Sequence, residues 1–348
     1  MKRSVPLVFS VSITAFFVSL LVLIFARRST AFARNICASV ALFFKETLLA
    51  VSNLIPFSLY ELLLASAPII LVALFFGVVL QKGEKALVRR RFLKIISIFL
   101  LLSIVYIFAF SVGFFTSNVP DGAVSADELS SAMKILSFYI KKNVPEKSVS
   151  LDMAEEKLYL AYSRLEYEDL FFFTLKPHFK ALAFSSVFSK LGILANYSFF
   201  TSEINLNTEA PLYTLLFSAS HEMAHLYGVS GEGKADFYAY LACVSSGEAY
   251  LCYSAYLNAF EYLYRELSFI DKKLADEIFL DLPAYAKEDV ASYLAYYRKN
   301  SGNARKASAM LNETVLSPFL DRSGVSYDSF TVILTKHILS SNENLSTE

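Results

Sequence analysis

Two histidines and a glutamate at fixed spacing are the residues of this chain most suited to chemistry. His221 and His225 are two of the 4 histidines in 348 residues. On a helix, side chains four residues apart project from one face, so both imidazoles can bind the same metal ion. Glu222 lies next to His221 and can face the open coordination position. This H-E-x-x-H spacing is typical of zinc hydrolases.

A catalytic zinc ion needs a third protein ligand and leaves its fourth position to water. After His225, Gly228 can end the helix and turn the chain, and Glu232 is the first carboxylate that follows. We therefore expect His221, His225 and Glu232 to bind Zn²⁺, with Asp236 as the alternative third ligand. If Glu232 is the ligand, Asp236 lies four residues later on the same helix face. It can then accept a hydrogen bond from a ligand histidine and fix its tautomer.

Purely structural roles would account for the same residues without a metal ion. The histidines could be ordinary core residues, and Glu232 could interact only with the dipole of the helix that it begins. However, burying two imidazoles and the charged Glu222 on one helical turn costs free energy unless these groups have partners. The sequence therefore favours metal binding.

The expected chemistry is hydrolysis of a peptide bond by zinc-activated water. Glu222 would take the proton as general base and return it to the leaving amine. Tyr253 and Tyr256 on a later helix could stabilise the transition state, although in a chain with 21 tyrosines both are more easily explained as packing residues. His178 and His337 are expected to be structural.

The composition indicates that part of the chain meets lipid. Hydrophobic residues make up 55% and charged residues 18%. Residues 1–115 contain 12 Lys and Arg against 3 Asp and Glu, whereas residues 116–348 contain 20 against 29. The excess of basic residues in 1–115 is typical of the segments that flank membrane helices. Residues 116–348 are acidic overall and offer no basic surface that would bind nucleic acid. The predicted partners are thus the lipid bilayer and a peptide or protein substrate, and nucleic-acid binding is not expected.

Three apolar runs predict transmembrane helices at about 5–26, 62–80 and 95–115, because about 20 helical residues span a bilayer. The first run could instead be a signal peptide, but it is long and no small-x-small cleavage site ends it. Residues 35–58 are interrupted by charge and predict an interfacial helix followed by a turn.

The basic residues between these runs predict the orientation of the chain. Six positive charges lie between Lys82 and Lys94, in a short loop that should stay in the cytoplasm. Arg27, Arg28 and Arg34 would then lie on the opposite side, which argues against this orientation. The shorter and denser loop should dominate, so we expect a multi-pass protein of the plasma membrane with an extracytoplasmic C-terminal domain.

Residues 116–338 predict a mainly helical domain. Ser125 and Glu128 have the spacing of a capping box, and Pro211 suits the first turn of a buried helix that carries the histidines. The tail, 339–348, is expected to be disordered. The other predicted elements are helices at about 152–166, 186–191, 232–244 and 251–267, two or three more within 271–335, and a hairpin or edge strands at 195–200 and 203–207.

The chain has three cysteines, none with C-x-x-C spacing. Cys243 and Cys252 flank a turn and could form a disulfide across a helical hairpin outside the cytoplasm. Burial as two small apolar residues is the favoured alternative.

The chain resembles an uncharacterised family of membrane-anchored zincin-like proteins, a domain of unknown function. The segments that carry the resemblance are 55–62, 205–207, 221–228, the positions of Glu232 and Ala235, 241–243, 253–257 and 324–327. It implies a zincin-like metallopeptidase domain with a glutamate third ligand behind transmembrane helices, and no substrate. The sequence differs at Lys234 and Asp236, where Glu and Asn would be expected, which leaves Glu232 as the better ligand. The seven residues from His225 to Glu232 are a shorter interval than in many glutamate-type zincins.

Two further functions fit the same residues. In an intramembrane zinc protease the motif would lie within a span, but Asn205, Asn207 and Glu209 lead into a short helix and favour a site above the bilayer. A non-catalytic membrane scaffold or sensor would keep the metal only for stability, and Glu222 would then be dispensable.

Overall fold

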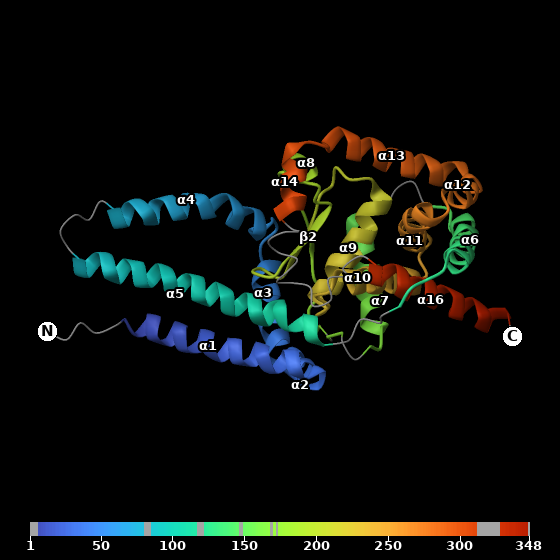
Figure 1. The fold of residues 1–348 in the computed structure, drawn as a ribbon. Helices are drawn as coiled ribbons and strands as arrows, with labels where there is room; N and C mark the ends of the chain where they lie inside the picture. Colours follow the sequence, from blue (N-terminus) through green and yellow to red (C-terminus); the bar gives the residue numbers. More distant parts are fainter. Residues whose placement is uncertain are drawn as a thin grey trace.

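The chain is mainly helical and carries one small β-sheet (Figure 1). The computed structural model describes residues 6–79, 85–116, 122–145, 149–167, 170–171, 173–311 and 328–346.

Three long apolar helices extend from one end of the C-terminal domain (Figure 1). They are α1 (Leu7–Arg28), α4 (Leu59–Val79) and α5 (Lys85–Ala109). Their side chains are largely uncovered by protein: Ile69 of α4, for example, is 70% exposed. Such exposure of apolar surface would be unfavourable in water and suits a lipid environment. The three predicted spans correspond to these helices.

Four stretches of the described chain, one more than the sequence predicted, are long and apolar enough to cross a membrane. They are Leu7–Arg28, Thr30–Asn53, Leu59–Gly77 and Ala86–Phe115.

The additional stretch falls where the sequence predicted an interfacial helix. It consists of α2 (Thr30–Ile36), a π-helical turn (Cys37–Ala41) and α3 (Leu42–Asn53). In Figure 1, α3 runs across the domain-side ends of the long helices. Its buried residues Lys45 and Leu49 lie on one face, so protein, and not lipid, covers that side of α3.

The C-terminal domain is built from helices whose positions largely agree with the predictions. The predicted capping box is present: Ser125 Oγ accepts from the Glu128 N–H, and the Glu128 carboxylate accepts from the Ser125 N–H. The helices are α6 (Ala126–Lys142), α7 (Leu151–Arg164), α8 (Ser185–Leu191), α9 (Leu212–Leu226), α10 (Glu232–Ser245), α11 (Ala249–Ile270), α12 (Lys272–Leu280), α13 (Ala284–Asn300), α14 (Asn303–Leu311) and α16 (Asp328–Ser346).

The end of the chain differs from its prediction. Residues 339–348 were expected to be a disordered tail, but α16 continues to Ser346. Phe330 and Leu334 of this helix are fully buried and Ile338 is nearly so. This apolar face packs against α6, α10 and α11, and the polar end continues the helix that packing has already formed.

The sheet has strand order β1-β3-β2. The predicted hairpin is confirmed as β2 (Ala195–Ser198) antiparallel to β3 (Glu203–Leu206). The parallel strand β1 (Phe179–Ala181) was not predicted, because three residues carry too little periodicity. The sheet also holds the start of α4, since the buried Glu203 carboxylate accepts the N–H groups of Leu59 and Tyr60 at 3.1 and 2.9 Å.

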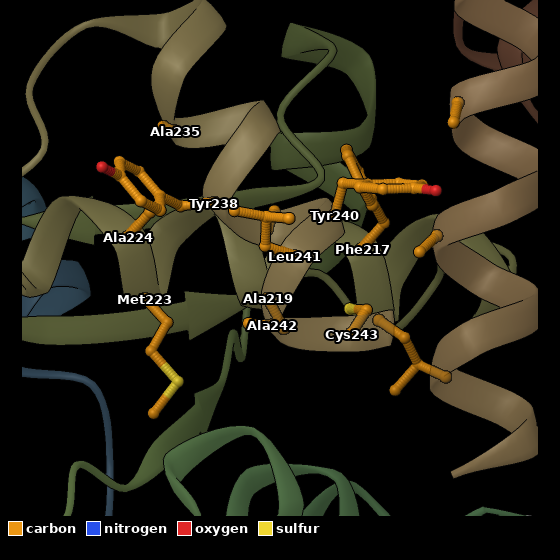
Figure 2. Packing of buried hydrophobic residues seen from close by; sticks show 14 of the residues in the cluster. Phe217, Ala219, Met223, Ala224, Ala235, Tyr238, Tyr240, Leu241, Ala242 and Cys243 are labelled. Atoms are coloured by element: carbon orange, nitrogen blue, oxygen red, sulfur yellow. The ribbon is translucent and has the colours of Figure 1, made fainter. Parts of the chain in front are cut away.

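Small residues bring α9 and α10 close together. Ala219 and Ala224 of α9 and Ala235 and Ala242 of α10 lie in the shared core shown in Figure 2, and all four are fully buried. Ser220 Oγ donates directly to the Ala239 carbonyl of the facing helix at 3.2 Å. The short side chains allow this approach, and it brings the N-terminal carboxylates of α10 to the histidine face of α9.

Cys243 and Cys252 are free thiols in the core, so the alternative of burial without a disulfide is the one observed. Burial raises the pKa of the Cys243 thiol to about 12 and that of Cys252 to about 11. Both residues therefore act as apolar packing residues at neutral pH.

Candidate metal centre

The C-terminus of α9 forms a Schellman motif that positions the second histidine. Gly228 has a φ of +104°, which is the left-handed conformation that glycine adopts without steric cost. Its N–H bonds the His225 carbonyl at 3.2 Å, and the Val229 N–H bonds the Ala224 carbonyl at 3.1 Å. The turn brings the Val229 carbonyl back beneath the imidazole of His225.

Both histidines have their Nδ1 atoms hydrogen-bonded to acceptors. His225 Nδ1 lies 2.7 Å from the Val229 carbonyl oxygen, and His221 Nδ1 lies 2.7 Å from Asp236 Oδ1. A carbonyl and a carboxylate accept, so each Nδ1 carries the proton and each Nε2 can offer its lone pair to a metal ion. This arrangement is common around ligand histidines.

The Glu232 carboxylate completes a three-ligand cluster with these Nε2 atoms. Glu232 Oε2 lies 3.2 Å from His221 Nε2 and 3.7 Å from His225 Nε2. The three ligand atoms all lie within 4.8 Å of one another. Ligands about 2.0–2.1 Å from a tetrahedral zinc ion are about 3.3 Å apart, so these residues fit Zn²⁺.

The charges of the cluster shift the pKa values of its members. Burial alone would lower the pKa of His221, but Asp236, with Glu232 and Glu222, raises it well above its usual value. Burial would raise the pKa of Glu232, but His225 and His221 hold it well below its usual range. Without a metal ion, the carboxylates around His221 thus favour its protonated form.

Glu222 lies on the same turn, with its carboxylate anchored to the sheet. Its Oε2 accepts the backbone N–H of Tyr197 in β2 at 2.6 Å. Burial raises the pKa of the Glu222 carboxyl, although the two histidines oppose the shift. A carboxylate with a raised pKa is a stronger base, which suits proton transfer near neutral pH.

The cluster opens into a cleft of about 860 Å³. One wall is the segment from Leu191 to Tyr197, which includes most of β2, and the floor is the histidine face of α9. Tyr106 of α5 and the adjoining Phe110 also line the cleft, and the ring of Phe110 lies next to that of His225. The other side is formed by residues of α11, α13 and α14, namely Asn258, Glu261, Tyr262, Arg265, Tyr293, Arg305, Ser308 and Ala309.

The remaining residues singled out in the sequence lie elsewhere. The Tyr253 hydroxyl donates to Asp289 at 2.6 Å, and Tyr256 stacks on Tyr139 at 5.1 Å. Neither tyrosine is among the described residues that line the cleft. We therefore assign neither a role in catalysis.

The two other histidines also have structural surroundings. His178 contacts Glu155 through Nδ1 at 3.1 Å, and His337 packs against the ring of Phe237.

Several residues that contact the cluster were missed in the sequence. Lys45 contacts it from α3, Phe110 from the end of α5, and Val229 and Tyr197 through main-chain atoms. The sequence marked Lys45 only as an interruption of an apolar run, and main-chain groups have no sequence signal at all.

The observed class is a mainly helical protein with apolar N-terminal helices, a small sheet and a cleft that contains a His-His-Glu cluster. The chain belongs to the DUF3810 family, described as a protein of unknown function, and the match covers residues 38–335. This range includes the four residues His221, Glu222, His225 and Glu232. No curated protein and no solved structure matches the chain.

Proposed function

We propose that this protein is a membrane-anchored, zinc-dependent metallopeptidase of zincin type. The observation that carries the proposal is the convergence of His221 Nε2, His225 Nε2 and Glu232 Oε2 beside Glu222 in an open cleft. Zinc bound there would supply Lewis-acid chemistry, polarising a carbonyl group and lowering the pKa of a water molecule. Asp236 holds the tautomer and orientation of His221.

Glu222 is the proposed general base, and β2 the proposed surface for the substrate. The backbone N–H of Tyr197 fixes one carboxylate oxygen of Glu222, which limits its rotation at the cleft floor. β2 is an outer strand of the sheet, and Ala195, Asn196 and Tyr197 line the cleft. An extended peptide can pair with an exposed strand edge, which would lay its backbone across the histidine face.

The proposed location of the domain is outside the cytoplasm at the plasma membrane. In Figure 1, the start of α1, the end of α4 and the start of α5 all lie at the far end from the domain. Arg89, Arg90, Arg91 and Lys94 lie in the first part of α5, toward that end, and such residues favour the cytoplasmic side.

The test combines zinc content with hydrolysis of a mixed peptide library by purified full-length protein. We expect about one zinc ion per chain in the wild type and in Glu222→Gln, and loss of zinc in His225→Ala. Glu222→Gln should lower hydrolysis by at least about 100-fold while the fold remains. His178→Ala is the matched control, because His178 is a partly exposed histidine outside the cluster, and it should retain both zinc and activity.

Absence of zinc from the wild type would refute the zinc site. Full activity in Glu222→Gln with zinc bound would refute the proposed base. If a cellular function of the protein persisted in Glu222→Gln but not in His225→Ala, a non-catalytic scaffold or sensor would replace the peptidase.

A further inference from the structure

The end of the helix α5 lies directly against the metal cluster. The ring of Phe110 is 5.7 Å from the ring of His225, between centroids. Ser230, in the loop between the ligand helices, donates its Oγ hydrogen to the Phe110 carbonyl at 2.6 Å. Phe110 lies near the end of the apolar stretch Ala86–Phe115, so the cluster lies within one layer of side chains of a candidate transmembrane helix.

Main-chain packing holds these two segments together. Gly113 belongs to the 3₁₀ turn Ser111–Phe115, and a Cβ atom added there would lie 2.5 Å from the Gly228 carbonyl oxygen. The contact therefore requires glycine at position 113. Since Gly228 ends the histidine helix, this backbone contact fixes the position of the cluster along α5.

The cleft wall from Leu191 to Tyr197 is connected through α8 to another apolar helix. Glu61 in the first turn of α4 accepts the N–H groups of Ala183 and Phe184, both at 2.8 Å. Phe184 is 58% exposed and Val187 of α8 is 52% exposed, although both are large apolar residues. These side chains suit a bilayer surface. Leu191, the last residue of α8, begins the cleft wall that continues to Tyr197.

We infer that the cleft opens at the bilayer surface and takes a polypeptide that is itself anchored in the membrane. The substrate would be the segment next to a transmembrane helix, entering past Tyr106 and Phe110. The Phe110–His225 separation of 5.7 Å and a headgroup layer of about 5–8 Å correspond to about 3–4 residues of extended chain. Cleavage is thus expected about 3 to 4 residues from the substrate's transmembrane helix. This inference rests on the proposed peptidase function and names its substrate class.

The test uses full-length protein in lipid nanodiscs with a library of model substrates. Each substrate is a single transmembrane helix followed by a randomised segment of about 30 residues. A second library has the same segments without the helix. Mass spectrometry locates the cut bonds, and Glu222→Gln protein is the background control. We expect anchored substrates to be cut at least about 10-fold faster than free segments, at bonds clustered near the helix.

The outcomes separate this inference from the peptidase proposal. Equal rates for free and anchored segments, or cuts spread evenly along the anchored ones, would overturn the bilayer substrate and leave the peptidase intact. No cleavage of either library would overturn both.

Cross-linking gives a readout independent of turnover. In Glu222→Gln protein, a benzophenone amino acid replaces Tyr106 at the cleft or Phe269, which is 82% exposed on α11. Position 106 should cross-link anchored substrates at residues next to their span, and position 269 should not. Equal labelling from both positions would contradict an entrance at the α5 end.

Discussion

The ammonium group of Lys45 donates hydrogen bonds to the main-chain carbonyl of His225 at 2.6 Å and to that of Leu226 at 3.0 Å. These carbonyls belong to the last turn of the histidine helix, where the helix dipole favours a cation. Lys45 is 1% exposed and lies over the rings of Phe171 and Tyr197. A residue 180 positions away in the chain thus stabilises the end of the helix that carries the histidines.

Lys45→Met should destabilise the protein by about 2–4 kcal/mol, because it removes two charge-assisted hydrogen bonds and leaves buried carbonyls without this donor. Thermal or denaturant unfolding in detergent measures the change. Lys134→Met replaces an exposed lysine of α6 and should alter stability by less than about 0.5 kcal/mol. Equal effects of the two substitutions would contradict the assigned role of Lys45.

Gly228→Ala should destabilise the end of α9 by at least about 2 kcal/mol and weaken zinc binding. Alanine is strained at a φ of +104°, and its Cβ would approach a ring carbon of Phe171 to 2.5 Å. Displacement of the turn would also move the Val229 carbonyl from His225 Nδ1. Gly231→Ala is the matched control three residues later, where a Cβ meets nothing within 4 Å. It should cost no more than about 1 kcal/mol. A neutral Gly228→Ala would argue against the importance of the turn.

Asp236→Asn should weaken zinc binding about 10- to 100-fold, because Asp236 orients His221 and makes it more basic. Competition with a zinc chelator measures the affinity. Asp276→Asn, on the exposed face of α12, should leave it unchanged.

The same variant should change the pH dependence of the zinc-free protein. The folded-state pKa of His221 is raised, so its stabilising contribution is complete below the unfolded value of about 6.5. It is lost as the pH rises through the folded value. Chelator-treated wild type should therefore lose stability above about pH 6.5, and Asp236→Asn should lose less. Parallel stability profiles for the two proteins would refute this coupling.

Glu261→Gln should remove a loss of stability that the wild type shows between pH 5 and pH 8. Relative to the wild type, the variant's free energy of unfolding should therefore be higher by roughly 1–3 kcal/mol at pH 8 than at pH 5. Burial raises the pKa of Glu261 to about 7, and nearby Asp289 contributes to the shift. Between about pH 4.5 and 7 the folded state therefore holds a proton that the unfolded chain has lost, so wild-type stability falls as the pH rises. The Tyr213 hydroxyl, which donates to Glu261 at 3.0 Å, can also donate to glutamine.

Unfolding free energies at the two pH values check this expectation. Glu277→Gln changes an exposed glutamate of α12 and should not alter the profile. If Glu261→Gln had the same pH dependence of unfolding free energy as the wild type, Glu261 would titrate with an ordinary pKa.

Much of the fold could be predicted where local chemistry decides it. The Ser125–Glu128 capping box and the hairpin at 195–207 depend on neighbours in sequence, and both are present. The predictions failed where packing decides. β1 exists because three residues pair with β3, and α16 extends through a polar tail because its earlier part is packed.

For the site, the sequence alone determined the residue types and their spacing. Four residues from His221 to His225, a glycine at 228 and carboxylates at 232 and 236 limit which side chains can share a helix face or follow a turn. The tertiary structure decided what surrounds them. The Val229 carbonyl, the Tyr197 N–H, the Lys45 ammonium and the end of α5 reach the cluster through main-chain atoms or distant chain segments. Main-chain groups are identical in every sequence, and contacts between segments far apart in the chain depend on how whole helices pack.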